Sequence, residues 1–103
     1  MLPEDKLKMI QSRSEELEAA MSGEMGEVAP DDFVRMSREY AEIKPLVEAI
    51  QKFQQTRDEL AGINEMLDSP DTDAEMKEMA ELELEELRAL LPDLEHSIKI
   101  QLL

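Results

Sequence analysis

The chain has 103 residues, about the size of one domain, and its 26 acidic residues outnumber its 11 basic residues to give a formal net charge of −15. Phosphate backbones and anionic membrane surfaces repel such a chain, so we expect neither direct nucleic-acid binding nor membrane association. Only three aromatic residues (Phe33, Tyr40 and Phe53) and no cysteine are present, which argues against large cofactor pockets and excludes disulfides and thiolate metal sites.

The first predicted helix runs from about residue 3 to residue 22. Pro3 and the two acidic residues after it are a typical helix start, because proline at the first helical position wastes no hydrogen bond and acids favour the positive end of the helix dipole. An apolar stripe at helical spacing follows, with Ser14 as its weak point: Leu7, Ile10, Leu17 and Met21. Gly23 and Gly26 are expected to end the helix.

The second predicted helix covers about residues 31–67 and begins after Pro30. Its apolar positions follow steps of three and four, slip once, and resume: Phe33, Met36, Tyr40, Ile43, Val47 and Ile50, then Phe53, Leu60, Ile63 and Leu67. Pro45 removes the hydrogen bond to the Ala41 carbonyl, which costs roughly 3 kcal/mol in an ideal helix interior. A kink at Pro45 and a split into two helices both remain open.

The third predicted helix covers about residues 72–102. Pro70 followed by Asp71 is one start signal for it, and Thr72 and Glu75, which have the spacing of a capping box, are a second candidate beside it. Its apolar residues alternate by four and three, which is the heptad spacing typical of coiled-coil-like packing: Ala80, Leu84, Leu87, Leu91, Leu94 and Ile98. Pro92 lies within this pattern, and we favour a kink there because the stripe keeps its phase through the proline.

No segment alternates with period two, so we predict an all-α fold without a sheet. The short "DSPD" connection requires an antiparallel αα-hairpin between the second and third helices. The expected architecture is an elongated antiparallel three-helix bundle forming one domain over residues 1–103. The first helix is too short to cover the hairpin tip at Asp68–Asp71. Three methionines near that tip are therefore candidate partner-docking residues: Met66, Met76 and Met79.

The sequence offers no catalytic, metal or cofactor site. A row of acids in the third helix suggests metal ligands, but carboxylate-bridged metal sites in helix bundles need two Glu-x-x-His motifs and this chain has one histidine, His96. A solvated helix face is the better interpretation of that row: Glu81, Glu83, Glu85 and Glu86. No nucleophile elbow, phosphate-binding glycine loop, signal peptide or transmembrane run occurs, so we expect a soluble cytoplasmic protein.

Three features, taken together and in order, resemble a known family. They are Ser37-Arg38-Glu39-Tyr40 with Pro45 shortly after, the "MLDSPD" turn, and "EMKEMAELELEEL" leading into "IKIQLL". The chain resembles the N-terminal helical domain of bacterial class I peptide chain release factors, and is most similar to the release factor one type, which reads the stop codons UAA and UAG. The resemblance covers nearly the whole chain and is weakest over residues 1–30. Pro92 departs from the family pattern.

The resemblance implies a ribosome and protein docking module that acts in translation termination without catalysis of its own. The Gly-Gly-Gln motif that triggers peptidyl-tRNA hydrolysis and the codon-reading tripeptide are absent from these residues, so we expect an excised domain and carry no catalytic residue onto it. The implied partners are the stalk base of the large ribosomal subunit, the class II release-factor GTPase and the release factor glutamine methyltransferase.

The alternative function is a free-standing acidic coiled-coil adaptor that dimerises through its leucine-rich third helix.

We call Ser37-Arg38-Glu39-Tyr40, together with Pro45, the family-marker motif. Within it, periodicity places Tyr40 on the buried stripe and turns Ser37, Arg38 and Glu39 mostly outward, where Arg38 can pair with Glu42. The sequence assigns these polar residues no partner contact, and they serve as a marker of the family.

Overall fold

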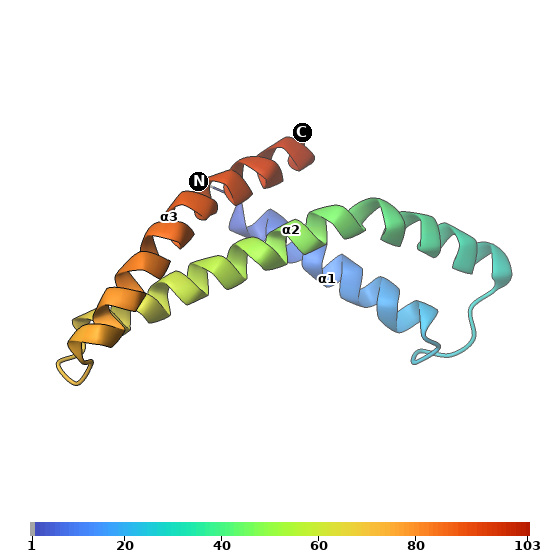
Figure 1. The fold of residues 1–103 in the computed structure, drawn as a ribbon. Helices are drawn as coiled ribbons and strands as arrows, with labels where there is room; N and C mark the ends of the chain where they lie inside the picture. The colour runs from blue at the N-terminus through green and yellow to red at the C-terminus, as the bar shows by residue number, and fades with distance from the viewer. Residues whose placement is uncertain (1) are drawn as a thin grey trace. The chain divides into compact units, whose positions relative to one another are not determined.

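A computed structural model describes residues 2–103, and these residues form three α-helices and no strand (Figure 1). The helices are α1 (Glu4–Met21), α2 (Pro30–Asp68) and α3 (Ala74–Leu102). The all-α prediction is therefore confirmed, with helix ends within two residues of those expected. Within the described chain, none of the helices has an apolar stretch long enough to cross a membrane.

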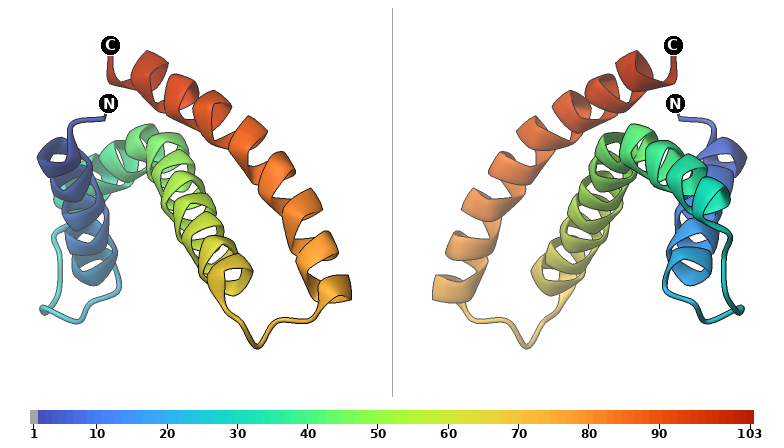
Figure 2. Two further views of the ribbon diagram at one scale, coloured as in Figure 1. Left: turned by 90° about the vertical axis from the view of Figure 1, so that its left-hand side faces the viewer. Right: turned by 90° about the vertical axis from the view of Figure 1, so that its right-hand side faces the viewer.

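The chain divides into two compact units, Met1–Ile50 and Gln51–Leu103. The first contains α1 and the beginning of α2, and the second contains the rest of α2 and all of α3. In each unit a loop reverses the chain, so that the two helical segments run antiparallel (Figure 2). The boundary between the units lies inside α2.

The helix starts follow the predicted chemistry at two of three places. Pro3 is the N-cap residue of α1 and Pro30 is the first residue of α2, each followed by two acids. Both start signals expected for α3, Pro70 and the capping box at Thr72, are wrong, because the helix begins at Ala74. Asp73 caps α3 by accepting a hydrogen bond from the Met76 amide at 2.8 Å, whereas the Thr72 hydroxyl donates to the Met66 carbonyl at the end of α2.

Both internal prolines lie within unbroken helices. α2 continues through Pro45 and α3 continues through Pro92. The split at Pro45 that the sequence left open does not occur, and a kink at either proline stays a prediction. Because proline has no amide hydrogen, the Ala41 and Arg88 carbonyls each lack the usual intrahelical donor at these positions.

Most of the buried side chains of the first unit belong to the predicted stripes of α1 and α2, whereas Leu2 precedes α1 and was not predicted. Its buried side chains are Leu2, Leu7, Ser14, Leu17, Val47 and Ile50. Ser14, the weak point of the α1 stripe, is buried between apolar neighbours on the same face. Phe33 was predicted on the buried stripe, but it lies in the first turn of α2 and is 45% exposed. Gly23 and Gly26 follow α1 with positive φ angles of 85° and 105°, a conformation that glycine adopts readily.

The core of the second unit joins the end of α2 to the start of α3. Ile63, Ala80, Leu84 and Leu87 form a buried cluster, against which Leu60 and Leu67 pack. The gap in the predicted α2 stripe between Phe53 and Leu60 is filled by Thr56, which is buried and donates its hydroxyl to the Lys52 carbonyl at 2.8 Å. The heptad prediction for α3 is confirmed, because four of its six positions are buried and Leu91 and Leu94 are partly buried.

Candidate functional site

The Ser37-Arg38-Glu39-Tyr40 motif lies on α2 and faces α1 inside the first unit. Three of its four side chains make polar contacts to α1: Ser37 to Met21, Glu39 to Arg13 and Tyr40 to Glu18. Ser37, the first of these three residues in α2, contacts Met21, the last of their partners in α1, as expected for an antiparallel pair. The motif is therefore part of the seam that holds α1 on α2.

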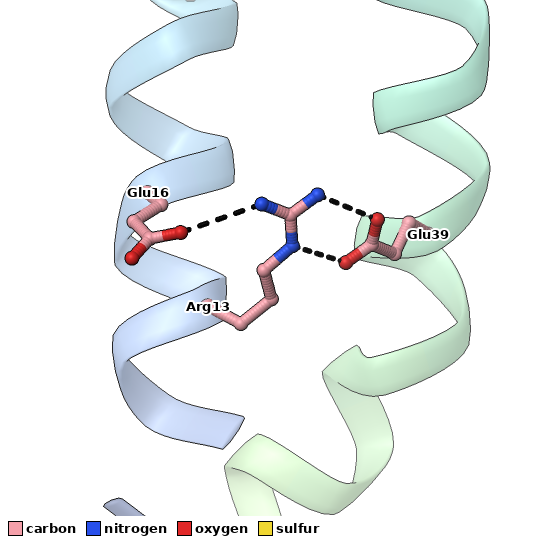
Figure 3. Close-up of polar contacts among 3 residues, drawn as sticks. All are labelled: Arg13, Glu16 and Glu39. Carbon is pink, nitrogen blue, oxygen red and sulfur yellow. Dashed lines mark hydrogen bonds and ion pairs between the residues drawn. The ribbon is translucent and has the colours of Figure 1, made fainter. Parts of the chain in front are cut away.

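The strongest of these contacts is a bidentate ion pair between Arg13 and Glu39 (Figure 3). The Arg13 Nη2 donates to Glu39 Oε1 at 2.8 Å, and Nε donates to Oε2. The third guanidinium nitrogen, Nη1, donates to Glu16 Oε2 on α1 at 3.3 Å. Two nitrogens of the planar guanidinium thus bind Glu39 on α2, and the third binds Glu16 on α1. Lysine, with a single ammonium group, cannot reproduce this geometry.

This pair changes the protonation energetics of both partners. The hydrogen bond from Arg13 lowers the pKa of the Glu39 carboxyl below its usual value. The same bond raises the pKa of the Arg13 guanidinium, which is already fully protonated at any physiological pH. Both side chains are partly exposed to solvent, so salt and water weaken the attraction.

Tyr40 adds a second polar tie to α1. Its hydroxyl donates to Glu18 Oε1 at 2.7 Å. This hydrogen bond, reinforced by partial desolvation and by the carboxylate charge, raises the pKa of the phenol. The Ser37 hydroxyl lies 3.5 Å from the Met21 sulfur, which is a weak acceptor.

The prediction that Ser37 and Glu39 point outward is wrong, since both are partly buried and contact α1. Arg38 is exposed as expected, but among residues 2–103 it makes no ion pair with Glu42. Periodicity along α2 could not identify Arg13 or Glu18 as partners, because it ignores the other helix. Arg13 is, however, the only cation between Lys8 and Arg35, and that isolation in an acidic region was a usable signal.

Pro45, the last residue of the family marker, lies on the exposed side of α2. It belongs to the same unit as the motif and follows Tyr40 by just over one helical turn. A hollow of about 620 Å³ lies nearby in this unit, lined mainly by α1 residues and by Ile43 of α2. Arg13 contributes to its wall, so the ion pair with Glu39 also fixes one side of that hollow.

The three tip methionines come together in the second unit. Met66 of α2 and Met76 and Met79 of α3 line a hollow of about 210 Å³ with Ile63, Ala80 and Glu83, which we call the methionine groove. Its floor is formed by the buried residues Ile63 and Ala80 of the core cluster. The methionines are 38%, 48% and 66% exposed, in chain order, so each is partly open to solvent.

The turn beside the methionine groove is held by its own side chains. The Thr72 hydroxyl bonds to the Met66 carbonyl, the Ser69 hydroxyl accepts from the Asp71 amide at 3.3 Å, and Asp73 caps α3. Backbone groups that α2 and α3 leave unpaired at this end are thereby satisfied in part. The groove is consequently built on two fixed helix ends.

The acids and the histidine that suggested metal chemistry are spread over the surface. Glu81, Glu83, Glu85, Glu86 and His96 are all exposed on α3. Within residues 2–103, no three Asp, Glu, His or Cys side chains converge in a way that could hold a metal ion. The row of acids is a solvated helix face.

Comparisons with known proteins identify relatives over nearly the whole chain. The family model described as the PCRF domain matches residues 10–103. The chain is 44% identical to peptide chain release factor 1 of Gluconobacter oxydans over 97% of its length, and 41% identical to those of Rhodospirillum rubrum and Paracoccus denitrificans over 97% and 100%. It spans 27% of the length of each of these relatives. No solved structure matches.

Proposed function

The chain belongs to the PCRF-domain family, and from this premise we propose that it is the N-terminal helical domain of a peptide chain release factor that acts in translation termination at UAA and UAG codons. The single observation that carries the proposal is the family match over residues 10–103, joined by identities of about 40% to release factor 1 proteins along essentially the entire chain. The free-standing adaptor receives no support from these comparisons.

In this proposal the domain serves as a docking module and performs no catalysis itself. Its three helices present no converging metal-ligand set in residues 2–103, and the sequence has no Gly-Gly-Gln motif. The partners are the stalk-base region of the large ribosomal subunit, the class II release-factor GTPase and the release factor glutamine methyltransferase, all met in the cytoplasm by the whole factor. The net charge of −15 favours protein partners with basic surfaces over direct nucleic-acid contact.

The family-marker motif has an internal role in this account. The polar groups of Ser37, Glu39 and Tyr40 are bonded to α1, so we interpret these residues as holding the two helices in register. Arg38 is the member of the motif that stays exposed to a partner. Substitution at Arg38 is therefore the cleaner probe of direct docking.

The experiment compares the whole factor carrying this domain with the same factor lacking residues 1–103. Ribosomes are stalled with peptidyl-tRNA in the P site and UAA, UAG or UGA in the A site, and factor binding and peptide release are measured separately. We expect release at UAA and UAG but not at UGA from the whole factor, and weaker ribosome binding after deletion. Unchanged binding by the deleted factor would remove the docking role, and release at UGA would contradict the assignment to the UAA- and UAG-reading type.

A further inference from the structure

The methionine groove carries an inference about the chemistry of its partner. We propose that it binds a basic amphipathic α-helix of a partner protein, whose apolar side chains sit on the methionines while its lysines and arginines pair with the surrounding carboxylates. The inference deepens the proposed docking function and rests on that function for its biological role. The groove's geometry and charge support it independently.

The apolar half of the argument comes from the groove itself. Met66, Met76 and Met79 project from two helix ends over the floor made by Ile63 and Ala80. Methionine is unbranched and polarisable, so a group of exposed methionines can adapt to differently shaped apolar side chains. Grooves between helices are a recurrent docking place for the apolar face of an amphipathic helix.

The negative charge around the groove favours a positively charged partner. Residues 58–86 contain twelve carboxylates and a single cation, Lys77, and so hold −11 of the chain's net −15. Glu83 belongs to the groove wall itself. A field of this strength attracts basic partners and accelerates their encounter, and it discriminates against acidic ones.

The same charge argues against other occupants. A second copy of this chain would bring a matching negative field to the groove, and self-association would have to overcome that repulsion. Strand addition requires an exposed sheet edge, and residues 2–103 contain no strand. A helix with one apolar face and one basic face matches both the apolar groove and the negative charge around it.

The test uses this chain labelled at the methionine methyl groups with carbon-13 and a synthetic peptide of about 18 residues, with leucines on one helical face and lysines and arginines on the other. Titration is followed by methyl NMR, in which each of the eight methionines is a separate probe. We expect saturable shifts at Met66, Met76 and Met79, and unchanged signals from Met25, which is exposed in the loop after α1. A peptide of the same composition in scrambled order, without an apolar face, controls for charge alone.

Two matched variants separate apolar docking from simple charge attraction. Met79→Glu and Met25→Glu add the same negative charge at exposed methionines, one inside the methionine groove and one outside it. Charge attraction alone predicts that both variants bind the peptide slightly more tightly. Apolar docking predicts that Met79→Glu weakens binding by about tenfold or more while Met25→Glu does not. Met66→Gln, which leaves the net charge unchanged, should weaken binding in the same direction.

Several results would overturn the inference. Equal affinity for the ordered and scrambled peptides, or shifts spread over all methionines, would show charge attraction without a site. Methyl shifts that depend on protein concentration in the absence of peptide would make a second copy the occupant. Because the peptide assay needs no ribosome, its failure leaves the termination experiment standing, and failure of the termination experiment leaves peptide binding intact.

Discussion

Arg13 of α1 and Glu39 of α2 are 26 residues apart in the chain and form a two-pronged ion pair, with Nη2 donating to Oε1 at 2.8 Å and Nε donating to Oε2. The pair ties the shortest helix of the fold to the longest. Together with the hydrogen bond from Tyr40 to Glu18, this pair helps to fix how α1 is aligned on α2, because each of these polar groups has a specific partner on the other helix. The seam can therefore be tested one pair at a time.

Replacing Glu39 with alanine should lower the thermal midpoint of unfolding by up to a few degrees, because a partly exposed pair contributes modestly even with bidentate geometry. Arg38→Ala changes the neighbouring residue of the same motif, which is exposed, and serves as the matched control with little expected change. Thermal unfolding followed by circular dichroism checks both. A larger loss from Arg38→Ala than from Glu39→Ala would contradict the role given to the ion pair.

The contribution of Glu39 should depend on pH in a defined direction. Its pKa in the folded chain is lowered from the ordinary value of 4.5, chiefly by the hydrogen bond from Arg13. The folded state therefore favours the carboxylate, and its stabilisation is present above pH 4.5 and lost as the pH falls through the lower folded-state pKa. The stability difference between the native chain and Glu39→Gln should shrink over that acid range, as measured by urea unfolding at several pH values. A difference that persists in strong acid would point to lost packing instead.

Tyr40 should ionise above its ordinary pKa of 10.0, because its hydroxyl donates to the Glu18 carboxylate. It is the only tyrosine, and the chain has no tryptophan, so ultraviolet absorbance reports this residue alone. Glu18→Ala should move the titration midpoint back toward 10.0. Since the folded-state pKa is raised, the stabilisation from this contact is present below pH 10 and is lost as the pH rises further. An unchanged midpoint in Glu18→Ala would show that the hydrogen bond does not form in solution.

The predictable part of this fold was the part governed by a single helix. The stripe of α3 located Leu84, Leu87 and Ile98 in the core, since heptad spacing on one helix determines which side chains share a face. The orientation of Glu39 was predicted wrongly, because its partner lies on another helix and its burial comes from the register between the two. Phe33 failed for a related reason: it lies in the first turn of α2 and is not covered. At the tip, three methionines could be assigned from their nearness to the turn, but their convergence with Ala80 required the packed hairpin.

Asp73→Ala should destabilise the chain by about 1 kcal/mol, because the Asp73 carboxylate accepts a hydrogen bond from the Met76 amide that alanine cannot replace. Asp71→Ala removes the same charge two residues earlier, outside the cap, and should have a smaller effect. Urea unfolding of the two variants measures the difference. If both variants lose the same stability, general charge rather than capping is responsible.

Gly62 lies inside α2 with open space where a Cβ atom would project, so Gly62→Ala should stabilise the chain by about 1 kcal/mol through higher helix propensity. Gly23→Ala offers a matched contrast: space is also open there, but the φ angle of 85° strains a residue with a side chain. We therefore expect opposite signs for the two substitutions. Stabilisation by both would show that Gly23 does not hold its left-handed conformation in solution.

The continuity of α2 through Pro45 and across the boundary at Ile50 means that the two units share a helix and have no linker between them. A fragment cut at that boundary would leave up to four carbonyls at one new helix end and up to four amides at the other without the hydrogen-bond partners that they have inside the intact helix. The connections outside regular helix are residues 22–29 and 69–73. A protease acting on the folded chain should therefore cleave at these two loops. Each of the three fragments would contain one helix, and α2, which spans the boundary between the two units, would stay in one piece.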